Sequence, residues 1–338
     1  MENKNLAHIM QYMLRQIDKR ERNVVGKTIE NFNISKSSAY NYLKKMCDEG
    51  MIESEKRGSY CLVTKKYKFR YANDGKLDED RLFDRDIAKY FQHLEKNVIS
   101  AWRYAFTEMM NNAIEHSNAK WITVVVGMNA LNTSIMICDD GIGIFKNIQQ
   151  YIKREKNEDL ALEECVALLF AGKFTTAKQW HSGEGIFFTS HLMDQFMILS
   201  DGVWFSRDSF RDVQTGGFTV PNGTGVYMVL DNHSKKTTLE VFDRFSDVEE
   251  GFIRTQIPIA HIFPNGSPVS RSEARRLGEL VLRFKEIELD FLGVEEVGQA
   301  FVHELFIVWQ GRNPEIRLNI SNANQAVERM IKRVLNTK

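Results

Sequence analysis

The spacing of apolar residues over the first fifty positions predicts three consecutive helices. Apolar side chains recur at helical intervals over 5–20, a short segment at 26–30 fits a second helix, and 36–49 repeats the pattern. Ser35 precedes the third segment and can cap it, because its hydroxyl can accept a backbone N–H that has no partner within the first turn. Gly50 then lets the helix end at low steric cost.

Residues 51–63 show two short runs on either side of a turn at 56–59, a pattern that predicts a β-hairpin. Three helices followed by a hairpin resemble the winged helix-turn-helix family. The resemblance implies that the third helix reads bases and that the hairpin tip contacts phosphates. The implied DNA-binding residues are Lys36, Ser37, Ser38, Tyr40, Asn41 and Lys44 on the helix, and Lys56 and Arg57 at the tip. Protein interaction is the alternative use of such a module.

The middle of the chain predicts a larger α/β unit after a polar linker at 71–82. The expected helices span 82–94, 97–116, 160–170 and 186–193, and the expected strands span 121–128, 134–138, 196–200, 203–206, 217–220 and 225–230. This order favours an α/β sandwich with a mixed sheet and helices on one face.

The last ninety residues alternate between helical and strand patterns, which predicts a small domain of helices on a sheet. The expected helices span 269–284, 298–309 and 324–334, and the expected strands span 286–290 and 316–320. The overall fold class is therefore α/β with several domains.

Composition adds a charge asymmetry to this picture. The chain balances 45 Lys and Arg against 45 Asp and Glu, but residues 1–70 hold 15 basic and 8 acidic residues, a net of +7. A basic N-terminal segment favours contact with nucleic acid. The four cysteines show no metal-binding spacing, and no signal peptide or membrane-length apolar run is present. We therefore expect a cytoplasmic protein that does not enter a membrane.

Two polar residues on the helix expected at 97–116 suit a magnesium nucleotide. Glu108 and Asn112 are four positions apart and share a helix face. A neutral amide oxygen can join the Mg²⁺ shell beside phosphate oxygens, and a carboxylate can act as general base toward the group that attacks the γ-phosphate. Taken alone, such a pair is more often two polar groups on an exposed helix face.

Two glycine-containing pieces follow at a distance. Asp139 ends an apolar strand, where its carboxylate can accept from the amino group of adenine, and Gly141 and Gly143 allow close approach of the backbone. Gly183 and Gly185 precede a helix whose free N–H groups favour phosphate. Each piece alone also fits a surface turn or a flexible loop.

The three pieces in this order resemble the GHKL ATPase superfamily, and within it the anti-sigma-factor serine kinases, over about 95–232. The resemblance implies ATP as cofactor, Mg²⁺ at Asn112, Glu108 as base and Asp139 on adenine. It also implies phosphate contacts in a lid that contains Lys173 (or Lys178), Thr175 and Thr176, and it includes the turn that holds Thr224. Phe187 replaces a glycine that is common in the second glycine box.

Residues 250–335 resemble the STAS-like fold of anti-anti-sigma factors, in which a strand and a turn lead to a phosphorylatable Ser at a helix start. Here the turn reads Gly298-Gln299-Ala300-Phe301 and contains no Ser or Thr. The resemblance implies a docking domain without its phosphoacceptor. A structural or dimerisation domain is the alternative.

These observations divide the chain into a winged helix-turn-helix at 1–70, a linker and leading helix at 71–94, a GHKL ATP-binding domain at 95–235 and a STAS-like domain at 250–338. The function we expect is that of a DNA-binding regulator in which Mg-ATP binding or slow hydrolysis changes domain arrangement or partner binding. The alternatives are a serine/threonine kinase acting on a separate protein and an ATP sensor without turnover. A sigma- or anti-sigma-like protein partner and a homodimer stay open.

Overall fold

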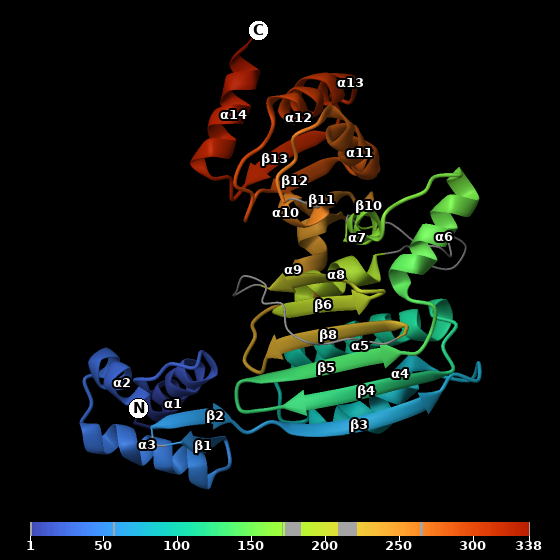
Figure 1. Cartoon of the computed structure of the whole chain (residues 1–338). Helices are drawn as coiled ribbons and strands as arrows, with labels where there is room; N and C mark the ends of the chain where they lie inside the picture. The colour runs from blue at the N-terminus through green and yellow to red at the C-terminus, as the bar shows by residue number, and fades with distance from the viewer. Residues whose placement is uncertain are drawn as a thin grey trace.

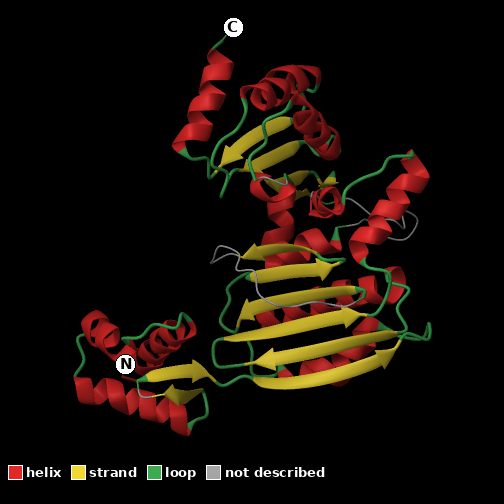
Figure 2. Ribbon diagram, viewed as in Figure 1, coloured by secondary structure: helices red, strands yellow, loops and turns green. Residues whose placement is uncertain are grey.

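The computed structural model describes residues 2–56, 58–170, 172, 184–208, 222–263 and 266–337. Figure 1 shows three parts: a small N-terminal module, a central sheet backed by helices, and a smaller C-terminal α/β unit at the opposite end. All three parts contain both helices and strands (Figure 2). The expected multidomain α/β class is confirmed.

The N-terminal module has the three helices and hairpin that its pattern predicts. These are α1 (Glu2–Asp18), α2 (Val24–Phe32), α3 (Lys36–Asp48), β1 (Ile52–Lys56) and β2 (Ser59–Leu62). Ser35 Oγ caps α3 by accepting from Ser38 N at 3.0 Å, and Gly50 adopts a positive φ just beyond the helix. A small apolar core, which includes Ile9, Met13 and Leu43, holds the helices together.

Within the described residues, the central sheet has six strands in the order β3-β4-β5-β8-β6-β7, and the strand expected at 217–220 lies outside those residues. The strands are β3 (Lys65–Ala72), β4 (Trp121–Met128), β5 (Asn132–Asp139), β8 (Thr224–Asp231), β6 (Gln195–Ser200) and β7 (Val203–Asp208). Every neighbouring pair is antiparallel, so the expected mixed sheet is wrong. Tight turns join β4 to β5 and β6 to β7, and such short connections permit only antiparallel pairing.

Strand β3 belongs to the central sheet, although the sequence pattern assigned its residues to the N-terminal module and the linker. It pairs with β4 over its whole length, from Lys65 opposite Met128 to Ala72 opposite Trp121. The boundary expected at residue 70 therefore runs through a strand. The paired residues of β4 lie between 49 (Ala72 to Trp121) and 63 (Lys65 to Met128) positions further along the chain, so no local pattern indicates them.

Helices cover the face of the sheet that carries Val124, Ile137 and Ile198. The main one is α5 (Lys96–His116), preceded by α4 (Glu79–Leu82), a π-helical turn (Phe83–Ile87) and a 3₁₀ turn (Ala88–Tyr90), which replace the continuous helix expected at 82–94. Helices α7 (Leu162–Phe170) and α8 (Gly185–Leu192) also contact the sheet, and α6 (Ile144–Lys156) packs against α7 and adds its buried side chains to the same core. The expected one-sided arrangement of helices agrees with this packing.

The C-terminal unit has a parallel three-stranded sheet, β11 (Arg254–Pro258), β12 (Glu286–Asp290) and β13 (Arg317–Ser321). Its helices are α10 (Ile259–Ile262), α11 (Arg271–Val281), α12 (Gln299–His303), a π-helical continuation (Glu304–Trp309), α13 (Gln310–Arg312) and α14 (Gln325–Asn336). Helix α9 (Thr238–Phe245) and the short strands β9 (Ser246–Asp247) and β10 (Gly251–Phe252) lead into it.

Candidate nucleotide site and nucleic-acid interface

Asp139 lies at the end of β5, next to the start of β8. Its Oδ1 atom accepts from the backbone N–H of Gly141 at 2.9 Å and of Thr224 at 3.3 Å. The carboxyl group is buried, with 7% of the residue exposed. Both hydrogen bonds fall on Oδ1, so neither uses Oδ2 as an acceptor. The structure thus brings together Asp139 and Thr224, which are 85 residues apart in sequence.

Glycines around Asp139 sit where a side chain would collide. A Cβ on Gly141 would come within 2.0 Å of Ser117 O, and a Cβ on Gly223 would come within 2.1 Å of Asp139 O. Gly143 and Gly223 also adopt positive φ, which favours glycine. The first glycine piece is therefore a close junction between the ends of β5, α5 and β8, and not a loose surface turn.

The start of α6 is fixed by Thr224 together with Ser200 and Asp201, of which the sequence reasoning selected only Thr224. Ile144 N donates to Thr224 Oγ1 at 2.9 Å and to Ser200 Oγ at 3.1 Å. Lys146 pairs with Asp201 at 2.8 Å, and Asp201 stands directly behind Gly143. The signal in the sequence was the Ser200-Asp201-Gly202 turn between two strands, which resembles many ordinary hairpin turns.

Burial is the main cause that raises the pKa of Asp139, to about 6. Hydrogen bonds from the backbone of Gly141 and Thr224 oppose this effect, and the neighbouring Asp140 adds to it. The carboxylate is thus ionised at neutral pH but loses its charge under mildly acidic conditions. An N–H donor on a bound molecule would stabilise the ionised form.

Glu108 and Gly185 meet about two turns of α5 away from this junction. A Cβ on Gly185 would lie 1.9 Å from Glu108 Oε2, so the carboxylate rests against the first residue of α8. Asn112 is half-buried on α5, one turn beyond Glu108 and five residues before Ser117. At 1.5 Å per residue, Asn112 lies roughly 6 Å along the helix axis from Glu108. Helix α5 therefore runs between the Glu108–Gly185 contact and the Asp139 junction, with Asn112 in between.

The lid residues Lys173, Thr175 and Thr176 lie outside the described residues, and so does Gly183. The same holds for Arg57 at the tip of the hairpin. Their expected contacts with phosphate or DNA stay predictions.

Phe187, the departure from the family pattern, has a clear place in the packing. It contacts Phe245 and Phe252 at ring-centroid distances of 4.9 and 4.6 Å, and Phe188 stacks on Phe242 at 4.1 Å. Both phenylalanines on α8 belong to the same buried cluster as the core of the C-terminal unit. Where the family pattern often has a glycine, Phe187 packs α8 against the core of the C-terminal unit.

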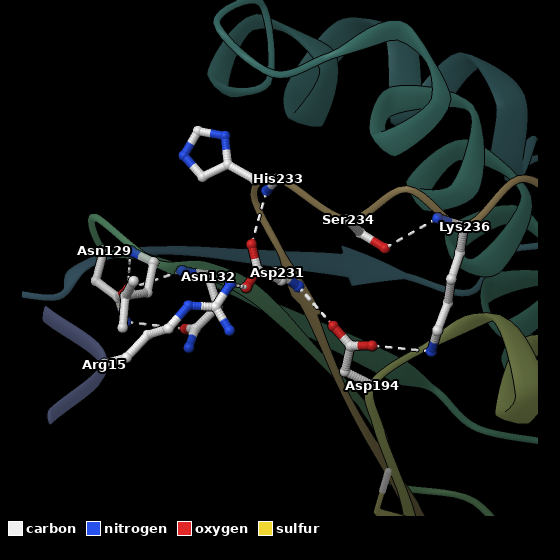
Figure 3. A network of polar contacts seen from close by, with 9 residues as sticks. Arg15, Asn129, Asn132, Asp194, Asp231, His233, Ser234 and Lys236 are labelled. Atoms are coloured by element: carbon white, nitrogen blue, oxygen red, sulfur yellow. Dashed lines mark hydrogen bonds and ion pairs between the residues drawn. The ribbon is translucent and has the colours of Figure 1, made fainter. Parts of the chain in front are cut away.

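The other end of α8 leads to the N-terminal module through polar contacts (Figure 3). Asp194 pairs with Lys236 at 2.8 Å and accepts from Asp231 N at 2.8 Å. Asp231 in turn pairs with Arg15 of α1 at 2.9 Å. Close by, Leu131 at the tip of the β4–β5 turn is buried in the apolar core of the N-terminal module.

The face of α3 is exposed as a DNA-reading helix requires. Lys36, Ser37, Tyr40, Asn41 and Lys44 are exposed, and so is Lys56 on β1. Ser38 is half-buried and its hydroxyl lies 2.9 Å from that of Ser35, so it supports the cap. Strand β1 also exposes Glu53 and Glu55, which do not favour phosphate.

Comparison with family models identifies both ends of the chain. Residues 20–63 match the MCM protein C-terminal winged helix-turn-helix domain, and residues 273–328 match a STAS-like domain of unknown function (DUF4325). No curated protein matches the chain. The protein is thus a multidomain α/β protein with an N-terminal winged helix and a C-terminal STAS-like domain. A winged helix supports DNA binding, and a STAS-like domain supports a regulatory role.

Within the described ranges, no helix has the length and apolar character that crossing a membrane requires.

Proposed function

We propose that the protein is a DNA-binding regulator whose central domain binds Mg-ATP. The observation that carries this proposal is the junction in which a buried Asp139 meets Thr224 and two close-packed glycines. Glu108 lies about two turns back along α5, where it contacts Gly185 of α8. The order of these pieces in the chain resembles the GHKL ATPases, and their spatial arrangement supports the same use. The central domain would then be a GHKL-type sandwich, although its sheet is antiparallel throughout.

The Asp139 junction suits the adenine base. Its Oδ2 atom would accept a hydrogen bond from the exocyclic amino group, while Oδ1 stays on the two backbone N–H groups. Guanine presents a carbonyl oxygen at the equivalent position, and two acceptors facing each other in a buried site are strongly unfavourable. The junction should therefore prefer ATP to GTP.

The Glu108 end suits the phosphates. Asn112 would supply one oxygen to Mg²⁺, and the N–H groups at the start of α8 would face negative charge. Glu108 would act as general base in slow ATP hydrolysis. Its contact with Gly185 links the base to the helix that phosphate would bind.

Helix α8 gives this site a route to both flanking domains. The first turn of α8 contacts Glu108, and its two phenylalanines pack in the core of the STAS-like domain. Just after the helix ends, Asp194 is hydrogen-bonded to Asp231, which pairs with Arg15 of the winged helix. A small shift of α8 on binding or loss of the γ-phosphate would alter both contacts. The regulated output would be DNA binding by the winged helix or docking of a partner on the STAS-like domain.

The test uses γ-labelled ATP with Mg²⁺, wild-type protein and Glu108→Ala, and follows both free phosphate and protein-bound label. We expect phosphate release that falls about 100-fold or more in the variant, as for loss of a general base. Label on an added protein would favour the alternative serine/threonine kinase. ATP binding with neither signal would favour a sensor, and no ATP binding would contradict the proposal.

DNA binding is tested separately by gel shift. Replacement of Lys36 and Lys44 by Gln should weaken binding to duplex DNA, and increasing salt should weaken the wild type because phosphate contacts release counterions. Equal binding by this variant would contradict the assignment of α3 as the reading helix.

A further inference from the structure

We infer that the DNA-binding surface extends beyond the winged helix onto strand β3 of the central domain. This inference rests on the proposed DNA-binding function and adds a second contact region to it. The juxtaposition that carries it is a row of cations, Lys66, Lys68 and Arg70, on an edge strand that follows directly from the wing.

Strand β3 holds much of the positive charge that the sequence pattern assigned to the N-terminal module. Of the net +7 over residues 1–70, four charges come from Lys65, Lys66, Lys68 and Arg70, with no acidic residue in β3. Residues 1–64 keep 11 basic and 8 acidic residues, a net of only +3. The winged helix alone is thus weakly basic, and the strand beside it is strongly basic.

The three cations of the row share one face of the sheet. Tyr67, Phe69 and Tyr71 alternate with them and pair with Val126, Val124 and Ile122, so these aromatic residues lie on the helix-covered face. Lys66, Lys68 and Arg70 therefore stand on the opposite face, and all three are exposed. Alternate residues of a strand are about 6.6–6.8 Å apart, which makes an ordered line of charge.

The cations of this row are available to bind phosphate, and one of them, Arg70, is already held in position. Among the described residues, no ion pair includes Lys65, Lys66, Lys68 or Arg70. The guanidinium of Arg70 lies 4.2 Å from the ring centroid of Trp121, which is 40% exposed. Stacking on a tryptophan holds the planar guanidinium in place, and this group suits bidentate phosphate contacts.

The position of the strand agrees with one continuous surface. Only Val63 and Thr64 separate β2 from β3, and Val63 N is bonded to Met51 O, so the connection is short and held. In Figure 1 α3, the hairpin and β3 follow one another along the lower edge of the view. Duplex DNA on α3 would thus pass near β3, where the row of cations would contact its phosphates.

Lysines on an edge strand have another ordinary use, because they prevent one sheet from pairing with another. The two roles predict different results. A protective role predicts that removal of the cations promotes self-association and leaves DNA binding intact. A phosphate-binding role predicts weaker DNA binding by a monodisperse protein.

The experiment measures fluorescence anisotropy of a labelled 30-base-pair duplex from 50 to 200 mM salt, using the full chain. The test variant is Lys66→Gln with Lys68→Gln and Arg70→Gln. The matched control is Arg329→Gln with Lys332→Gln and Arg333→Gln on α14, which removes the same charge from exposed positions at the other end of the molecule. A third protein carries Lys36→Gln and Lys44→Gln. Circular dichroism and gel filtration check folding and association.

We expect the β3 variant to bind at least tenfold more weakly at 100 mM salt and to lower the slope of log K against log salt by about 2 to 3, since each lost phosphate contact removes about 0.9. The α14 control should bind as the wild type does. If the β3 variant and the α14 control are weakened equally, β3 is not part of the DNA-binding surface, although the protein can still bind DNA. The same conclusion follows if the β3 variant binds as tightly as the wild type while the α3 variant binds more weakly. No duplex binding by the wild type overturns both the extension and the DNA function. Binding of anionic vesicles that depends on β3, with DNA binding unchanged, overturns the assignment to DNA.

Discussion

The two flanking domains contact the central domain through opposite chemistry. The STAS-like domain shares a buried aromatic cluster with α8, which includes Phe187 and Phe188. The contact with the winged helix consists of Leu131 of the central domain, which is buried in the core of the winged helix, and of an exposed ion pair between Arg15 and Asp231. Apolar burial couples folding strongly, whereas exposed ion pairs contribute little and are weakened by salt. From this comparison we expect that the STAS-like domain folds as one unit with α8, and that the winged helix can be repositioned, as the proposed function requires.

The largest expected effect comes from the aromatic contact. Phe187→Ala should lower the free energy of unfolding by about 3–5 kcal/mol, because it leaves a cavity among fully buried rings. Urea unfolding followed by circular dichroism measures this change. Leu239→Ala, at a site that is 68% exposed, is the control and should change stability by less than about 0.5 kcal/mol. A loss below about 1 kcal/mol in Phe187→Ala would show that the shared core is not a folding unit.

The next effect concerns the attachment of the winged helix. Leu131→Ala should cost about 2 kcal/mol, near the low end for a buried leucine, because the tip of a hairpin can shift to fill the cavity. The loss should appear in the N-terminal module and leave the central sheet intact. Limited proteolysis detects it as faster cleavage near residues 63–64 with an unchanged central fragment. Simultaneous loss of the central fragment would contradict the separable attachment.

A smaller effect follows from the buried carboxyl group. The folded pKa of Asp139 is raised to about 6 from an ordinary value of 3.8, so its contribution to the stability of the apo protein is fully present below the ordinary value and is lost as the pH rises through 6. In the proposed adenine site, ATP would need the ionised form and should therefore bind more weakly at low pH, by about tenfold at pH 5 relative to pH 7.5. Titrations by calorimetry at several pH values measure this. Asp139→Asn should bind ATP weakly and without this pH dependence; an identical pH profile in the variant would rule out Asp139 as the titrating group.

The smallest effect is expected at the exposed ion pair. Asp231→Asn should change stability by less than about 1 kcal/mol, since Arg15 is half exposed. If the polar chain transmits the state of α8, the same variant should nevertheless reduce any effect of ATP on DNA affinity. Gel shifts with and without Mg-ATP test this, with Arg20→Ala, which removes another exposed pair of the winged helix, as the control. An unchanged ATP effect would exclude the chain as the route.

Local patterns predicted the elements well and their partners poorly. The helices of the winged helix, the strand Trp121–Met128 and the strand Glu286–Asp290 follow from periodicity and caps near in sequence. Strand β3 was assigned to the wrong part because its alternating cations and aromatics indicate a strand but do not identify β4 as its neighbour. The expected mixed sheet failed for a related reason, since the strand patterns carry no direction of pairing.

The candidate site shows the same limit. The motif pieces gave Glu108, Asp139 and the glycines, and the fold brings Asp139 to Thr224 and Glu108 to Gly185. Ser200 and Asp201 were missed because they resemble a common turn, and their role depends on where α6 begins. Phe187 was noticed only as a missing glycine, since its partners Phe245 and Phe252 come about sixty residues later.

The most direct test of the central claim is the binding of Mg-ATP and Mg-GTP to the wild type and to Asp139→Asn, measured by calorimetry at pH 7.5. We expect the wild type to bind ATP with micromolar affinity and GTP at least about tenfold more weakly, because of the acceptor at Asp139. The variant should lose most of its ATP affinity and the preference, while its circular dichroism stays unchanged. Absence of ATP binding by the wild type, or equal binding of ATP and GTP, would contradict an adenine site at Asp139.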